Sequence, residues 1–154
     1  MIYLIVFLTA LFEGTLLDLI AVGNVKPDIL LIIVVFVASY KDLLKAVTVG
    51  ILAGFLKDIL SAGAFLNILV FGVCSIAVNL FANRFYFYKE KSLAQFLAVS
   101  IISAVTFCVY LLWFLEQGWT VSIVMLAVWV GIPTVFYTTL AAPFMFFILK
   151  RCKI

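Results

Sequence analysis

Long apolar runs separated by short polar gaps make up almost the whole chain. We expect six helices, over residues 2–22, 28–44, 45–60, 65–83, 94–115 and 121–149. A helix needs about 20 apolar residues to cross the hydrocarbon core, so 154 residues hold six crossings and short loops. The runs lack the alternation of membrane β-strands, and lipid does not satisfy an open backbone. The pattern predicts an all-α, polytopic membrane protein: a compact bundle of six transmembrane helices in one domain, residues 1–154.

The second run is short, and charged residues separate it from the third. Lys41, Asp42 and Lys45 interrupt the join. We expect these two helices to form a tight hairpin that is tilted or partly shielded by its neighbours. Pro27 fits the first turn of the second helix, where a missing N–H costs nothing.

The last run is too long for one upright helix. About 29 residues at 1.5 Å each exceed 40 Å, whereas the hydrocarbon core is about 30 Å thick. We expect Gly131-Ile132-Pro133 to interrupt the helix and Pro143 to add a second kink.

Basic residues fall in alternate gaps between the runs. Eight of the ten lie in the second gap, in the fourth gap and at the C-terminus: Lys41, Lys45, Arg84, Lys89, Lys91, Lys150, Arg151 and Lys153. Only Lys26 and Lys57 fall elsewhere. Because cytoplasmic loops carry an excess of Lys and Arg, the pattern predicts that both termini are cytoplasmic. A basic inner face next to anionic lipid is usual, and it gives no indication of nucleic-acid binding.

Composition supports a membrane protein and weakens an enzymatic interpretation. The chain is 68% hydrophobic and 11% charged, with a mean hydropathy of +1.38. The first run lacks a basic n-region, so we interpret it as a retained helix and not a signal peptide. The sequence contains no histidine, and its three cysteines form no CxxC pair. We expect no catalytic site, no metal site and no cofactor.

Glu13 is the ionisable residue placed deepest in a predicted span. A carboxylate at that depth must face protein or water, or be protonated, and it marks a functional site by default. The structural alternative is a hydrogen bond to a hydroxyl such as that of Thr15, or to an amide on another helix. The sequence suggests no deep cation that would complete a proton relay with Glu13.

The third run ends in a group of small and charged residues. Gly50 and Gly54 form a small-xxx-small step, which lets helices approach closely in lipid, and Lys57-Asp58 follow. The charged pair is either a solvated helix cap or, together with Asp28 on the same predicted membrane side, a contact point for a partner protein. We take these five residues as candidate partner-binding residues.

Three asparagines lie in the fourth run. Asn79 and Asn83 are one helical turn apart, on one face, and Asn67 lies near the start. Amides in a membrane usually form hydrogen bonds with neighbouring helices, so we expect a structural role for them.

Three segments, in this order, resemble a known family. They are Val25-Lys26-Pro27-Asp28-Ile29-Leu30-Leu31, then Gly50-Ile51-Leu52-Ala53-Gly54-Phe55-Leu56-Lys57-Asp58-Ile59-Leu60-Ser61, and finally Thr138 to Pro143. The chain resembles MreD, the small polytopic rod-shape-determining protein of bacteria, over essentially its whole length. It departs from that pattern at Glu13-Gly14-Thr15, where a Gln-Ser-Thr-like step is expected.

The resemblance implies a non-catalytic membrane component of the bacterial elongation machinery in the cytoplasmic membrane. Such a protein binds the single-span protein MreC. It supports the peptidoglycan polymerase RodA with its transpeptidase and, indirectly, the MreB filaments.

A rival function comes from the distant similarity of MreD proteins to the S components of energy-coupling-factor transporters. These are compact six-helix subunits that bind vitamins or other small molecules for import. A carrier needs a cavity lined by several polar groups, whereas the polar residues in these runs are few: chiefly Glu13, Asn67 and Asn79. We therefore favour the scaffold. A third interpretation, a lipid- or ion-handling protein, stays open.

Overall fold

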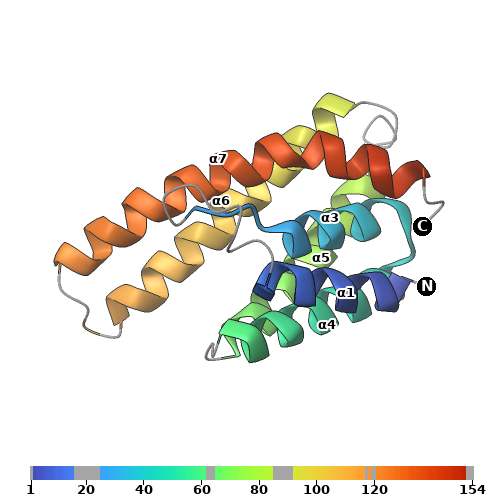
Figure 1. Ribbon diagram of the computed structural model, residues 1–154. Helices are drawn as coiled ribbons and strands as arrows, with labels where there is room; N and C mark the ends of the chain where they lie inside the picture. Colours follow the sequence, from blue (N-terminus) through green and yellow to red (C-terminus); the bar gives the residue numbers. More distant parts are fainter. Residues whose placement is uncertain are drawn as a thin grey trace.

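The protein is all-α. The computed structural model describes residues 2–15, 25–61, 65–84, 92–116, 118 and 121–151 (Figure 1). Its six described helices are α1 (Ile2–Thr15), α3 (Ile29–Tyr40), α4 (Leu43–Ser61), α5 (Leu66–Arg84), α6 (Ser92–Glu116) and α7 (Val121–Arg151). Each helix matches one of the six predicted runs, and its bounds differ from those of the run by a few residues. Residues 16–22 of the first run lie outside the described residues.

Helix length and hydropathy identify a multi-pass membrane protein. Among the described residues, three segments are long and apolar enough to cross a membrane: Leu66–Arg84, Gln95–Trp113 and Val128–Arg151. Two shorter apolar helices, α1 and α3, accompany them. The 19-residue helix α4 has a similar length but carries Lys45, Lys57 and Asp58.

The short helix α3 lies at the centre of the molecule. All its side chains from Leu30 to Ser39 are buried. It packs against α1, α4, α5, α6 and α7, and Phe36 meets Phe146 of α7 edge-on at a ring-centroid distance of 5.3 Å. Twelve residues span only about 18 Å, so α3 alone is too short to cross the hydrocarbon core. The prediction that this helix is shielded by its neighbours is confirmed.

Helices α4 and α5 pack closely because two glycines remove side chains from their interface. A Cβ at Gly50 would lie 2.7 Å from the carbonyl oxygen of Phe71, and one at Gly54 would overlap the backbone of Asn67 and Ile68. The small-xxx-small step therefore serves a contact within the chain.

Helix α7 is continuous, and the predicted interruption near Gly131 and Pro133 is wrong. Both prolines lie inside the helix, which at 31 residues is about 46 Å long. A proline removes one N–H donor, and a membrane helix accommodates the loss by small local adjustments. Gly131 has a different role, because the ring of Phe107 in α6 occupies the place where its Cβ would lie.

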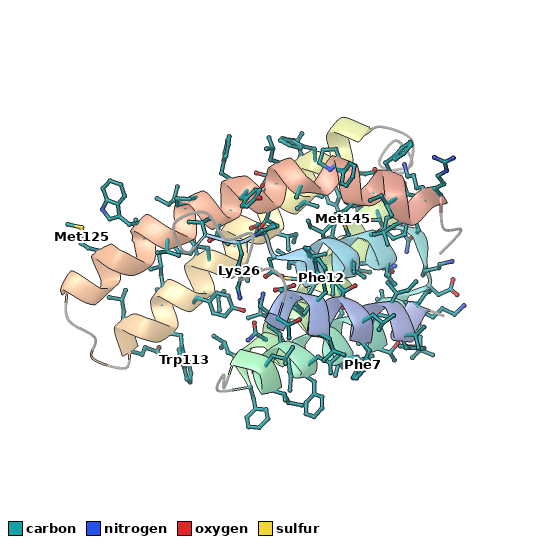
Figure 2. The ribbon with its side chains drawn as sticks, viewed as in Figure 1. Phe7, Phe12, Lys26, Trp113, Met125 and Met145 are labelled. Carbon is teal, nitrogen blue, oxygen red and sulfur yellow. The ribbon has the colours of Figure 1, made fainter. Side chains whose placement is uncertain are left out.

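The helices fall into two parts. We call α1, α3, α4 and α5 the four-helix group, and α6 with α7 the hairpin; the hairpin helices pack mainly against each other. Figure 1 shows the hairpin extending past the ends of α1 and α4. Trp113 and Met125 lie at its far end, away from Phe7 on α1 (Figure 2).

The two ends of the molecule differ. Helix α1 begins and α7 ends at the same end, which we call the terminal end (Figure 1). The connection between α3 and α4 lies there too (Figure 1). At the opposite, distal end α3 begins, α4 ends and α5 begins.

Candidate functional site

Glu13 lies buried in α1 and has two partners on other helices. Its Oε2 atom accepts a hydrogen bond from the N–H of Leu30 at 3.0 Å, at the start of α3. Its Oε1 atom lies 3.7 Å from Nζ of Lys57 in α4. The expectation that no deep cation lies near Glu13 is therefore wrong. Sequence spacing could not place Lys57 there, since 44 residues separate the two.

Lys57 lies between two carboxylates. Its ammonium donates to Oδ2 of Asp28 and forms ion pairs with both Asp28 and Glu13. The ammonium also lies 5.1 Å from the ring centroid of Phe71, within reach of a cation–π interaction. The Lys57 side chain is 22% exposed, and the two carboxylates are less exposed still. Two acidic groups thus share one cation in a place where water is largely excluded, so each charge depends on the others.

Asp28 holds the start of α3. It is the N-cap residue, and its Oδ1 atom accepts a hydrogen bond from the N–H of Leu31 at 3.0 Å. The N–H of Asp28 itself donates to the hydroxyl of Thr138 in α7 at 2.9 Å. One residue therefore connects the cation of α4, the first turn of α3 and the middle of the hairpin.

Asp58 is buried, being only 3% exposed, which excludes a solvated cap. Its Oδ1 atom accepts hydrogen bonds from the side-chain amide of Asn67 at 2.7 Å and from its backbone N–H at 3.3 Å. Its Oδ2 atom accepts one from the N–H of Ile68 at 3.1 Å. These donors belong to the first turn of α5, where the helix dipole favours a negative charge. Asp58 therefore joins the end of α4 to the start of α5.

Tyr110 brings α6 into the same cluster. Its hydroxyl donates to Oδ1 of Asn67, so that the Asn67 amide connects Tyr110 with Asp58. We did not predict Tyr110. The available signal was a tyrosine within an apolar run, because a buried hydroxyl usually finds a partner.

The two groups of contacts meet at the adjacent residues Lys57 and Asp58 and together involve every described helix, and we call them the polar network. Its members are Glu13, Asp28, Lys57, Asp58, Asn67, Tyr110 and Thr138. Among the described residues, no buried side-chain nitrogen or oxygen lacks a hydrogen-bond partner. The network lies at the distal end of the four-helix group and against the middle of the hairpin. Such an arrangement can fix helix positions, and its charges could also hold a polar solute if the helices moved apart.

Asn79 lies in a second polar cluster, at the terminal end of α3. Its amide donates to the carbonyl oxygens of Ala38 and Lys41, both at 2.8 Å, and so completes the end of α3. Asn83 donates to Oδ1 of Asn79 at 3.0 Å, as the one-turn spacing suggested. Gln95 of α6, which we did not predict, donates to the hydroxyl of Tyr40. The sequence-predicted polar residues therefore divide between the two ends of α3.

The five candidate partner-binding residues all make contacts within the chain. Gly50 and Gly54 face α5, Asp28 and Lys57 pair with each other, and Asp58 binds the start of α5. A direct contact of these residues with another protein stays a prediction.

Comparisons with protein-family models, with curated proteins and with solved structures found no match for this chain.

Proposed function

We propose that this protein is a non-catalytic scaffold of the bacterial elongation machinery. It lies in the cytoplasmic membrane with its terminal end, and so both termini, on the cytoplasmic side. It binds an MreC-like single-span partner and supports peptidoglycan synthesis by a RodA-type polymerase and its transpeptidase. The order of the three MreD-like segments is the basis for this choice, and the internal bonding of the polar network supports it.

The polar network is the structural observation that favours a scaffold over a solute carrier. A carrier in its ligand-free state keeps polar groups available for a solute. Here the charged and amide groups of the network bond to each other and to helix ends. Because a fully bonded buried network specifies one helix arrangement, it suits a protein that presents a constant shape to its partners.

The hairpin is the surface that we assign to the partner. Several of its large side chains face outward: Trp129 is 76% exposed and Phe136 71% exposed. An apolar helix face in lipid gains little by burial alone, so a second transmembrane helix would add packing contacts there. In this proposal, Gly50, Gly54, Lys57 and Asp58 act indirectly, by holding the four-helix group from which the hairpin extends.

A solute carrier of the S-component type is the second candidate. One observation favours it: polar side chains from all six described helices meet at the distal end. The sequence alone indicated only that such groups were few. A carrier function requires that these bonds open to admit a solute, with Lys57 and its two carboxylates as the charged groups that would receive it.

A pull-down from native membranes in mild detergent, followed by mass spectrometry, tests the choice between them. We expect the tagged protein to retain an MreC-like single-span protein together with wall-synthesis enzymes. A Trp129→Ala/Phe136→Ala double variant should lose that protein. Phe144→Ala is the matched control, because Phe144 is also exposed on α7 but lies nearer the terminal end.

Three other outcomes would overturn parts of the proposal. Recovery of paired ATP-hydrolysing subunits with a membrane coupling protein would establish the carrier. Loss of the single-span protein from the Phe144→Ala control as well would show that the contact is not confined to the part of the hairpin around Trp129 and Phe136. Recovery of neither group from membranes that contain both would reject the scaffold.

A further inference from the structure

An apolar groove runs between α5 and α6 on the outside of the molecule. It encloses about 380 Å³. Its walls include Ala77, Val78 and Phe81 of α5 and Ala98, Ile101 and Ile102 of α6. The groove exists because α5 packs closely on α4 but only sparsely on α6. Val78 is buried at its floor, whereas Phe81 and Ile101 stand exposed at its rim.

The groove lies toward the terminal end of the molecule and has a cation at that end. Ala77, Phe81 and Arg84 are spaced four and three residues apart, so they share one face of α5. Arg84 is exposed in the last turn of that helix. Within the described part of the chain, it makes no ion pair or hydrogen bond. The face of α5 that lines the groove therefore leads, three residues beyond Phe81, to an exposed positive charge.

We propose that this groove binds an anionic phospholipid of the inner leaflet, with an acyl chain between α5 and α6 and the phosphate at Arg84. Basic positions beside transmembrane helices on the cytoplasmic side suit such headgroups. A partner helix, about 10–12 Å in diameter, can rest on the rim of the groove but is too wide to enter it. A narrow acyl chain fits this space better. The site is independent of the scaffold function and shares no residue with the polar network.

Lipid retention by the purified protein tests the headgroup contact. The full chain in detergent is mixed with phosphatidylglycerol or with phosphatidylcholine, and the bound lipid is counted by native mass spectrometry. Phosphatidylglycerol should bind about fivefold more tightly than phosphatidylcholine, the preference expected from one cation near the membrane surface. Arg84→Gln should remove this preference. Lys45→Gln, which also removes an exposed cation at the terminal end, should keep it.

A second variant and a cross-link test the groove itself. Ala98→Phe fills the groove and should lower the binding of both lipids, while the variant elutes as a monodisperse peak like that of the wild type. A photoreactive residue in place of the exposed Ile101 should cross-link to a diacyl lipid in native membranes.

Two outcomes would overturn the proposal. If the wild type, like Arg84→Gln, bound the two lipids equally, the proposed contact between the phosphate and Arg84 would be ruled out. A cross-link from position 101 to a protein instead of a lipid would assign the groove to a partner helix.

Discussion

The four-helix group and the hairpin are built in opposite ways. The four-helix group consists of helices of 12 to 19 residues, and it contains most of the buried charge and the close glycine contacts. The hairpin consists of helices of 25 and 31 residues, and many of its largest side chains face outward. Thr138 and Tyr110 are the points at which the hairpin joins the polar network.

The difference shows how one small membrane protein can use one part to fix the arrangement of its helices and another part to contact a partner. Charged and amide groups have few acceptable partners in lipid, so they specify a single arrangement of the four-helix group. Apolar side chains on the hairpin can meet lipid or another helix with similar energy. We therefore expect substitutions in the polar network to change stability, and substitutions on the hairpin to change association.

Lys57→Met should have the largest effect on stability. It removes the cation that Glu13 and Asp28 share and leaves two acidic groups close together. Breaking a buried ion pair from one side costs about 3–5 kcal/mol. The free energy of unfolding, measured by titration of mixed micelles with a denaturing detergent, should fall by that amount. Lys45→Met is the control; its exposed pair with Asp42 should contribute less than about 1 kcal/mol.

The double variant Lys57→Met/Glu13→Gln sharpens this prediction. Neutralising Glu13 removes one of the two acidic groups that lost their cation, so the double variant should be more stable than Lys57→Met alone. Simple additivity of the two losses would show that Glu13 and Lys57 are not coupled. It would also mean that Lys57 does not hold the two carboxylates of the polar network together.

Asp58→Asn should have the next largest effect. The amide keeps the size of the side chain but loses the charge, and its NH₂ group would face an N–H donor of Asn67 or Ile68. Hydrogen bonds to a charged group contribute about 1.5–3 kcal/mol, and the loss in unfolding free energy should be of that order. Asp42→Asn is the matched control, because the Asp42 side chain is 84% exposed. Equal effects of the two substitutions would mean that Asp58 does not hold the start of α5.

Gly54→Ala tests the close approach of α4 and α5. The added methyl group would overlap the backbone of α5, and inserting a methyl group into a well-packed contact costs about 1–3 kcal/mol. Gly72→Ala is the control within α5. Among the described residues, its Cβ would meet only Ile51 Cγ1, at 3.6 Å, and alanine favours a helix by up to about 1 kcal/mol over glycine. The thermal midpoint should fall in Gly54→Ala and rise in Gly72→Ala, relative to the wild type. Changes of the same sign would contradict the close contact of Gly54 with α5.

The sequence predicted the helices better than it predicted their contacts. Apolar run length located all six described helices, because the need for internal backbone hydrogen bonds in lipid leaves helix as the form for such runs. It did not predict that α7 passes through Pro133, since the cost of a proline depends on how the neighbouring helix packs. Gly131 suggested a break, whereas it accommodates the ring of Phe107.

In the polar network, too, the sequence predicted the residues better than their contacts. Glu13, Asp28, Lys57, Asp58 and Asn67 stood out in the sequence because polar groups in lipid are expensive. Which of these residues pair with each other could not be predicted, because Glu13 and Lys57 lie far apart along the chain and meet only through the packing of α1 on α4. The sequence also favoured an outward, partner-facing role for Gly50 and Gly54, since a small-xxx-small step does not reveal which helix it meets.

Trp129→Ala should have the smallest effect on stability and so gives the sharpest contrast with Lys57→Met. Trp129 is 76% exposed on the part of α7 that precedes Thr138, and an exposed substitution usually changes the free energy of unfolding by less than about 0.5 kcal/mol. Under the proposed scaffold function, the same substitution should weaken co-purification of the single-span partner. Unchanged stability with reduced co-purification would assign association to the hairpin. A stability loss as large as that of Lys57→Met would mean instead that the hairpin is part of the fixed core, and the division between a part that fixes the helix arrangement and a part that contacts a partner would fail.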